Sequence, residues 1–386
     1  MFVYLDNSAT TKPYTAVVEA VAQTMEARYG NPSSLHDMGM QADRILSDAR
    51  STVAHSIGAT EKEIYFTSGG TESDNLALFG VWESNKRIGR TIITTSVEHP
   101  AVLRACERLE ELGANIIYLP VSKQGVIDIE MFSRALDADT ILVSVMHANN
   151  ETGALMPIHS MLDVMREKKS RALFHTDAVQ SYGKARVDVK DMPVDLLSVS
   201  GHKIHGPKGV GALYVRNGTK IRSVAYGGGQ ENGLRSGTEN VPAIAGFACA
   251  VALQEKSFDE RIRHLSDVKK HLKAGILEEI EDVIFHTPDD SVPSILNAGF
   301  PGCRGEVLLR MLGQENIFVS TGSACSSKKA GSHVLEAMHV DSEAAKGAIR
   351  FSFSEENTIQ QMDYVVNVLK EAVRAQRKLS AFARKG

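Results

Sequence analysis

The sequence has few cysteines and no long apolar run, and both shortages limit what the protein can be. Its four cysteines lie far apart with no CxxC pair, which argues against a disulfide framework or a zinc site, so no resident metal is predicted. The longest apolar run, 241–253, is too short to cross a bilayer. The first residues lack the basic and apolar segments of a secretory signal. We therefore expect a protein of the reducing cytoplasm that does not enter membranes.

The overall charge gives no reason to expect a nucleic-acid partner. The formal net charge is −4, and charged residues make up 23% of the 386 residues. A protein that binds nucleic acid directly usually carries a basic surface. We therefore expect no direct nucleic-acid contact.

From about residue 60 onward, strands and helices alternate. Apolar, β-branched runs predict strands at 63–67, 91–95, 140–147, 172–176, 196–200 and 211–215. Helices are predicted at 71–83 and 101–112. Because the strand runs are nearly all apolar rather than alternating, we predict an α/β fold whose mostly parallel sheet is covered by helices on both faces.

After Gly237 the pattern changes. Two long helical stretches, 241–256 and 259–280, precede a smaller set of elements predicted at 294–297, 306–312, 348–354 and 358–378. The chain is too long for one small core. We predict a large domain at 13–256 and a smaller α+β C-terminal domain at 257–386, joined by residues 1–12.

A lysine and an aspartate follow two of the predicted strands. Strand 196–200 runs into Ser200-Gly201-His202-Lys203, and strand 172–176 is followed by Asp177. Ligands of such sheets bind beyond the carboxyl ends of the strands. Pyridoxal 5′-phosphate (PLP) needs an amine for its Schiff base and a carboxylate beside its pyridinium nitrogen. Taken singly, either residue is better explained as a surface lysine or a helix-capping aspartate, and only the other site residues reverse that preference.

Other polar residues follow neighbouring strands. The glycines and hydroxyls of Thr67–Thr71 precede a helix, where backbone N–H groups suit a phosphate, although Ser and Thr are also ordinary N-caps. His99 follows strand 91–95, and its ring is suited to stacking on PLP and to handling protons, or it is simply a loop histidine. Gln180 could donate to the PLP ring hydroxyl. Loop polarity alone would explain both Gln180 and Asn150.

Cys325 differs from the other cysteines in its surroundings. It lies among Ser, Gly and Ala, with Lys328 and Lys329 just after it, so we expect an exposed loop with a thiol that ionises readily. Cys106 and Cys249 lie in apolar helical stretches and are predicted to be packing residues.

These residues resemble the PLP-dependent cysteine desulfurases of the NifS/IscS type, in the class V aminotransferase family. The resemblance covers nearly the whole chain. It implies a fold type I homodimer with the active site near the subunit interface. The motifs that carry it are Tyr4-Leu5-Asp6-Asn7-Ser8-Ala9-Thr10-Thr11, His175-Thr176-Asp177, Ser200-Gly201-His202-Lys203, Arg235-Ser236-Gly237-Thr238, Ser323-Ala324-Cys325 and Arg350-Phe351-Ser352-Phe353.

The resemblance also implies a role for each site residue. The catalytic residues would be Lys203, which carries PLP, His99, which stacks on it and moves protons, and Cys325, which takes the sulfur. Asn150 and Arg350 would bind the substrate, with the Arg350 guanidinium forming paired hydrogen bonds to the substrate carboxylate. The residues expected to hold PLP are Gly70, Thr71, His99, Asp177, Gln180, Ser200, His202, Lys203 and, from the other subunit, Thr238.

The implied reaction converts L-cysteine to L-alanine and leaves the sulfur on Cys325 as a persulfide for an acceptor protein. The chain ends soon after 358–378, without the tail that scaffold-docking members use, so both an iron–sulfur scaffold and a tRNA-thiolation enzyme stay open as acceptors. Cys325 is also the residue that could transiently ligate a cluster. The alternatives are a selenocysteine lyase, an aminotransferase on the same scaffold, or a non-catalytic sulfur-carrier scaffold. Transamination needs no loop cysteine, and an idle scaffold needs neither Lys203 nor Asp177.

Overall fold

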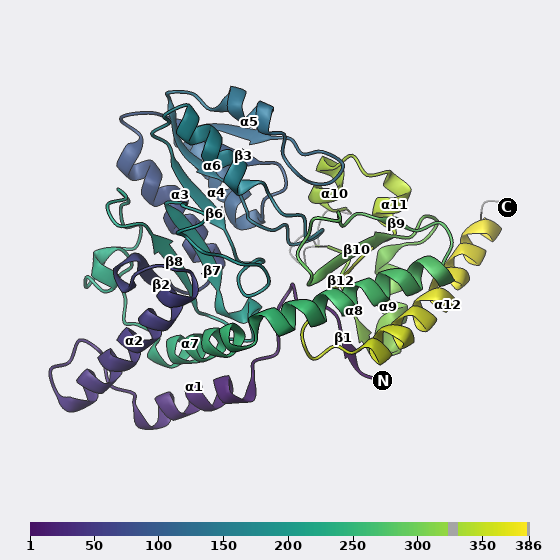
Figure 1. The fold of residues 1–386 in the computed structure, drawn as a ribbon, viewed down its shortest axis with the longest axis horizontal. Coiled ribbons are helices and arrows are strands. Elements are labelled where there is room, and N and C mark those ends of the chain that lie inside the picture. The colour runs from purple at the N-terminus through teal and green to yellow at the C-terminus, as the bar shows by residue number, and fades with distance from the viewer. Residues whose placement is uncertain (323–330, 384–386) are drawn as a thin grey trace.

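The computed structural model describes residues 1–322 and 331–383. Figure 1 shows two lobes, with the larger sheet in one and a smaller sheet in the other. Helix α8 reaches from the side of the large lobe along the small one (Figure 1). Within the described residues, the strands form a seven-stranded, a three-stranded and a two-stranded sheet.

The seven-stranded sheet has the order β2-β8-β7-β6-β5-β3-β4. Strand β8 runs antiparallel to both of its neighbours, and the remaining pairs are parallel. The predicted mostly parallel sheet is therefore confirmed. Its strands are β2 (Ile64–Thr67), β3 (Thr91–Thr95), β4 (Asn115–Leu119), β5 (Thr140–Ser144), β6 (Leu173–Asp177), β7 (Leu196–Ser200) and β8 (Gly211–Val215).

Helices cover both faces of this sheet, as the apolar strand runs predicted. One face packs on α3 (Gly70–Asn85) and α4 (Pro100–Glu111), through residues such as Leu78 and Leu109. The other face packs on the remaining helices of the large lobe (Figure 1). These are α1 (Thr15–Ala27), α2 (Asp37–Ser56), α5 (Ile129–Ala135), α6 (Ile158–Glu167) and α7 (Val241–Lys256).

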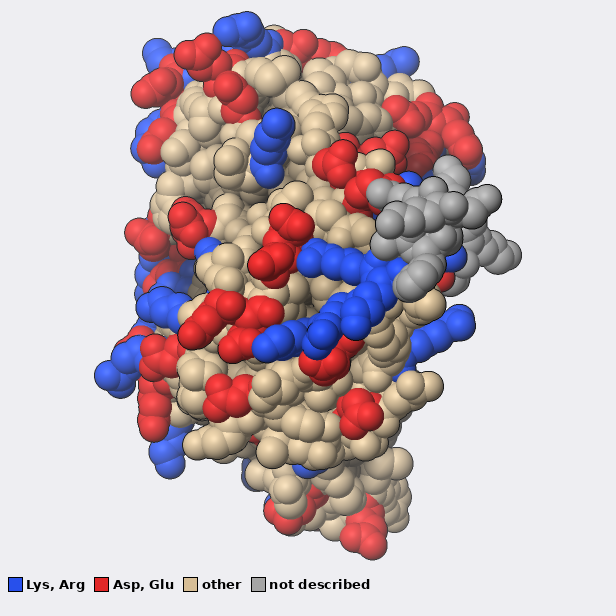
Figure 2. Space-filling view, turned by 90° about the vertical axis from the view of Figure 1, so that its right-hand side faces the viewer, with Lys and Arg blue, Asp and Glu red and all other residues tan. Residues whose placement is uncertain are grey.

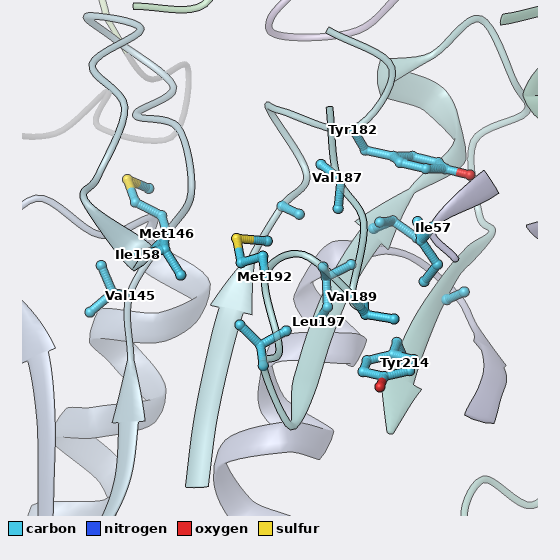
Figure 3. Packing of buried hydrophobic residues seen from close by; sticks show 14 of the residues in the cluster. Ile57, Val145, Met146, Ile158, Tyr182, Val187, Val189, Met192, Leu197 and Tyr214 are labelled. Atoms are coloured by element: carbon cyan, nitrogen blue, oxygen red, sulfur yellow. The ribbon is translucent and has the colours of Figure 1, made fainter. Parts of the chain in front are cut away.

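Figure 3 shows part of the larger apolar core on this second face, where Leu197 and Tyr214 from adjacent strands lie near Met192, Val189 and Ile57. Neighbouring residues of a strand alternate between faces, so Leu196 packs in the other cluster while Leu197 packs here. The two filled faces leave the ends of the strands as the places where polar side chains can gather.

The small lobe contains the antiparallel sheet β12-β10-β9 and the parallel pair β1-β11. Val3 and Leu5 of the N-terminal segment pack into its core. This packing supports our proposed division into 13–256 and 257–386 with 1–12. Its elements are β1 (Val3–Tyr4), α8 (Phe258–Glu279), β9 (Ile284–Phe285), β10 (Ile295–Gly299), α9 (Gly305–Gln314), β11 (Ile317–Phe318), α10 (His333–Ala337), α11 (Ser342–Lys346), β12 (Ala348–Ser352) and α12 (Ile359–Ala383).

Several features differ from the sequence-based expectation, including β4, α5 and α6, which the sequence analysis does not predict. Strand β5 ends at Ser144 instead of residue 147, because the Met146 backbone N–H donates to the buried Glu98 carboxyl, at 3.0 Å from each oxygen. Helices α1 and α2 lie in the first 60 residues, where no elements were predicted. Helix α1 buries only Val17 and Thr24, so its apolar pattern is weak.

The face in Figure 2 belongs to the right-hand side of Figure 1. On it, Lys and Arg side chains lie among Asp and Glu side chains, and a short row of positive side chains across the middle is bordered by negative ones. In the part of the chain that the structure describes, no helix is both long and apolar enough to cross a membrane.

Candidate active site

Four of the predicted site residues follow the carboxyl ends of adjacent parallel strands. His99 follows β3, Asn150 follows β5, Asp177 ends β6 and Lys203 follows β7. Parallel strands direct these ends to one edge of the sheet. The fold therefore gathers residues that are far apart in the sequence.

Lys203 and Asp177 lie close enough for their charges to interact. Burial raises the pKa of Asp177 to about 6, while the Val179 N–H, which donates to its Oδ1 at 2.9 Å, and the Lys203 charge both oppose that rise. At neutral pH the carboxyl is thus ionised. A buried carboxylate within reach of an amine is the pair that PLP requires.

His99 is held as a neutral imidazole. It is the N-cap of α4, and its Nδ1 accepts from the Ala101 N–H at 3.1 Å, so Nε2 carries the ring proton. Burial, together with the charges of Lys203 and His333, lowers the pKa of His99 to about 4. A neutral ring whose orientation is fixed is suited to stacking and to passing a proton through Nε2.

The N-terminus of α3 lies between the loops that follow β6 and β7. A Cβ added to Gly70 would come within 2.7 Å of Val179, and one on Gly69 would lie 3.6 Å from Ser200 Oγ. Gly69 has φ +146°, which a side chain would disfavour. The α3 N–H groups, Thr71 and Ser200 thus lie around one position.

Two further observations fit a phosphate at this position. Ser200 Oγ is buried and has no hydrogen-bond partner among the described residues. Burial and the nearby lysines, Lys203 first, lower the pKa of His202 to about 4, and its Nδ1 lies 3.2 Å from Thr10 Oγ1. A helix N-terminus with an unpaired hydroxyl is an established way to bind a phosphate.

The N-terminal segment contributes backbone atoms that the sequence analysis did not predict. Lys203 Nζ donates to Ser8 O at 2.5 Å and to Ala9 O at 2.9 Å. Gln180 Nε2 donates to the same Ser8 O at 2.9 Å and keeps a second hydrogen. The Tyr4–Thr11 motif was noted in the sequence, but only the fold shows that it lies against the lysine.

Arg350 and Asn150 are brought together from β12 and the loop after β5. Arg350 Nη1 donates to Asn150 O, and Nη2 donates to Asp6 Oδ1, both at 2.8 Å. Arg350 is only 2% exposed, and its Nε has no partner among the described residues. Asn150 Oδ1 is likewise buried and without a described partner. The guanidinium is therefore fixed in place, and its Nε–H is left without a described partner to bind a ligand.

Two more carboxyl groups lie under the site and were not predicted. Burial, and then the Asp177 charge, raises the pKa of Asp74 well above its usual range. Burial also raises the pKa of Glu98 to about 8, although hydrogen bonds from Met146 and Thr95 oppose this. Burial therefore disfavours a negative charge on both of these carboxyl groups.

A second buried amine, that of Lys184, lies near Lys203. Burial, and then the charges of Lys203 and Arg350, lowers the pKa of Lys184 to about 7. Its Nζ has no hydrogen-bond partner among the described residues. No sequence pattern predicts this buried amine, since Lys184 lies in an ordinary loop after β6.

Two predicted residues are not assembled with the rest. Thr238 is exposed on the loop before α7, and no contact found among the described residues joins it to Lys203 or Asp177. Cys325 lies outside the described residues. Among the described residues, no group of His, Cys, Asp and Glu is arranged to hold a metal ion.

The arrangement fits PLP: a lysine after β7, an aspartate ending β6, a histidine after β3, and a helix N-terminus beside an unpaired serine hydroxyl. With the α/β sheet, it defines a fold type I PLP enzyme.

Comparisons with known proteins narrow this class. The family model for class V aminotransferases matches residues 3–365. A cysteine desulfurase IscS of Dictyoglomus turgidum is 43% identical over 382 residues, covering 98% of this chain and 96% of that protein. The solved structure of a NifS-like protein has a TM-score of 0.92 at 40% identity and covers 97% of this chain and 100% of its own. A structure titled SspA in complex with cysteine has a TM-score of 0.79 at 33% identity, with coverages of 92% and 99%.

The chain therefore belongs to the class V aminotransferase family and, within it, to the cysteine desulfurases, which are PLP-dependent enzymes. The resemblance read from the sequence is confirmed, as is the fold class.

Proposed function

We propose that this enzyme binds PLP, converts L-cysteine to L-alanine and transfers the sulfur to its own Cys325. The observation that carries this proposal is the placement of Lys203 and Asp177 at the ends of adjacent parallel strands, together with a fixed arginine whose Nε–H has no described partner. When bound, PLP takes up the electron pair released at the Cα of an amino acid. The other requirements fall on residues of the chain.

The residues that would hold PLP are those that meet around the N-terminus of α3. Lys203 would carry it, Asp177 would pair with the ring nitrogen, and His99 would stack on the ring. Gln180 would donate its second Nε2 hydrogen to the ring hydroxyl. The phosphate would be bound by Gly70, Thr71, Ser200 and His202.

Arg350 and Asn150 would orient the substrate. A carboxylate oxygen at the open Arg350 Nε would form a charge-assisted hydrogen bond, and the contacts of Nη1 and Nη2 already fix the plane of the guanidinium. With the carboxylate bound there, the Cα proton of the substrate would be removed by the Lys203 amine. His99 Nε2 is the second group suited to proton transfer.

The sulfur step requires a thiolate. Cys325 Sγ would attack the substrate sulfur, so that an S–S bond forms as the Cβ–S bond of cysteine breaks. The electron pair left on Cβ takes up a proton, and the proton that Lys203 removed is returned to Cα, which together yield alanine. The sulfur stays on Cys325 as a persulfide. Lys328 and Lys329 follow in the sequence, and nearby positive charge favours a thiolate.

We also propose that the enzyme acts as a homodimer. Large apolar side chains are exposed on α1, on α2, on the connection between them and on the 224–226 segment, and such exposure on a monomer marks an interaction surface. Thr238 would reach the phosphate of the partner subunit. The exposed residues are Val18, Met25, Tyr29, Leu35, Met40, Val224 and Tyr226.

The sulfur acceptor is proposed to be a protein, either an iron–sulfur scaffold or a tRNA-thiolation enzyme. In the described residues the three cysteines, Cys106, Cys249 and Cys303, are free thiols, which supports a reducing compartment such as the cytoplasm.

The test is turnover with L-cysteine in the presence of PLP, measured as alanine and as the mass of the Cys325 peptide. Alanine together with a sulfur adduct on Cys325 is expected. Alanine with an unmodified Cys325 would refute the sulfur-transfer step and favour a lyase or aminotransferase.

A further inference from the structure

Glu151 lies where the two segments flanking residues 323–330 meet. One flank ends at Gly322, and the other leads through Ser332 into α10. Ser332 Oγ donates to Glu151 Oε2 at 2.5 Å. A Cβ added to Gly322 would lie 3.1 Å from the same oxygen. One flank is therefore hydrogen-bonded to the Glu151 carboxyl through Ser332, and the other passes close to it at Gly322.

The first flank is fixed to strand β12. Ser320 exchanges backbone hydrogen bonds with Arg350, at 3.1 Å and 2.7 Å. Ser320 Oγ then donates to Gly322 O at 2.7 Å. Gly322 has φ +136°, a conformation that favours glycine, and the missing side chain lets the backbone approach Glu151 closely.

The second flank is fixed to the loop after β3. Ser332 is the N-cap of α10, and its Oγ accepts from the Leu335 N–H at 3.1 Å. His333 Nε2 lies 3.0 Å from Glu98 O, one residue before His99. This flank is thus tied both to Glu151 and to the strand end that carries the stacking histidine.

Glu151 is itself fixed in the turn that carries the proposed substrate-binding asparagine. Its side chain is fully buried. Asn149 Oδ1 accepts from the Glu151 and Thr152 N–H groups, and Asn297 Nδ2 donates to Glu151 O at 3.1 Å. Burying a carboxyl group costs free energy unless it is hydrogen-bonded, so the buried position of the Glu151 side chain suggests a functional role.

We propose that Glu151 is a positioning residue: it binds the flank of the Cys325 segment that contains Ser332 and packs against the flank that ends at Gly322, beside the substrate site. This inference rests on the proposed role of Cys325 as the sulfur acceptor. A chain spans at most about 3.6 Å per residue, so the positions of the two flanks limit the reach of the short segment between them. Fixing both flanks lowers the entropy cost of bringing a nucleophile to its target.

Glu151→Gln and Ser332→Ala test this inference from the two sides of the hydrogen bond. Both should leave the change in PLP absorbance on adding cysteine within about twofold of wild type, because neither residue is proposed to touch the cofactor. Both should slow sulfur labelling of Cys325 by about tenfold to a hundredfold. Ser332→Thr keeps the hydroxyl and should restore labelling.

Asp341→Ala is the matched control, because it removes an N-cap from the neighbouring short helix α11 and does not contact Glu151. It should label Cys325 at the wild-type rate, which separates loss of the contact from general loss of a helix cap. Thermal unfolding of each holoenzyme identifies any variant that fails to fold. If Glu151→Gln does not fold, the labelling rate of Ser332→Ala tests the positioning role, because this variant leaves the Glu151 side chain in place.

Labelling of wild-type Cys325 together with wild-type labelling rates in Glu151→Gln and Ser332→Ala would overturn the positioning role alone. A wild-type enzyme that never labels Cys325 would instead overturn the proposed function, whatever the variants do. Equal slowing of the absorbance change and of labelling would show a general effect on the site and would also overturn the inference.

Discussion

Asp177→Asn is expected to stabilise the cofactor-free protein while it abolishes turnover. Burial raises the pKa of Asp177 from 3.8 to about 6, so ionising this carboxyl in the folded protein costs about 3 kcal/mol more than in the unfolded chain. Asparagine has nearly the same shape and retains an oxygen for the Val179 N–H. It removes the cost of the buried charge.

The gain should depend on pH in a defined direction. Below the ordinary value of 3.8, the wild-type carboxyl is protonated in both states, and the two proteins should be equally stable. As pH rises from 3.8 to 6, the unfolded chain loses its proton first, and wild-type stability falls. Above pH 6 the difference should level off at about 3 kcal/mol in favour of the variant.

The measurement is the free energy of unfolding by denaturant for both cofactor-free proteins between pH 4 and pH 8. Asp163→Asn, on the exposed side of α6, is the control and should show no such trend. PLP should reduce the difference by pairing with the ionised Asp177, and the variant should not turn over cysteine at saturating PLP. A variant no more stable than wild type at pH 8 would refute the view that this carboxylate is held ionised at a cost to stability.

Three further outcomes follow from the site. Lys203→Ala should lose both turnover and the visible absorbance of lysine-bound PLP, whereas Lys184→Met should keep that absorbance. Wild-type turnover by the Lys203 variant would disprove the assignment of Lys203 as the residue that carries PLP. Cys325→Ser should keep the change in PLP absorbance on adding cysteine but form no persulfide. The wild-type peptide that contains Cys325 should gain about 32 Da. The control Cys303→Ser should stay active. Arg350→Lys should raise the KM for cysteine by about tenfold to a hundredfold, because a lysine cannot retain the Asn150 and Asp6 contacts and still bind the substrate carboxylate. An unchanged KM would argue against Arg350 as the residue that binds this carboxylate.

Residues whose role depends on a strand end were predictable from the sequence. Lys203, Asp177 and His99 each follow a short apolar run, and in a parallel sheet such positions converge on one edge. Glu98 could have been found in the same way, because a carboxylate so close to a fully buried strand is unusual. Asp74 had a weaker signal, as a charge close to the buried Leu76, Ala77 and Leu78.

The sequence by itself determined six of the seven strands of the large sheet, its mostly parallel character and the local motifs, because these depend on periodicity and on residues close together in the chain. Only the tertiary structure decided which distant groups meet: Arg350 with Asp6, Lys203 with Ser8 O, and Glu151 with Ser332. It also decided the charges, since burial raises the pKa of Asp177 and lowers that of Lys184. Contacts across hundreds of residues, and the desolvation of individual side chains, arise only when the whole chain folds, so no local pattern encodes them.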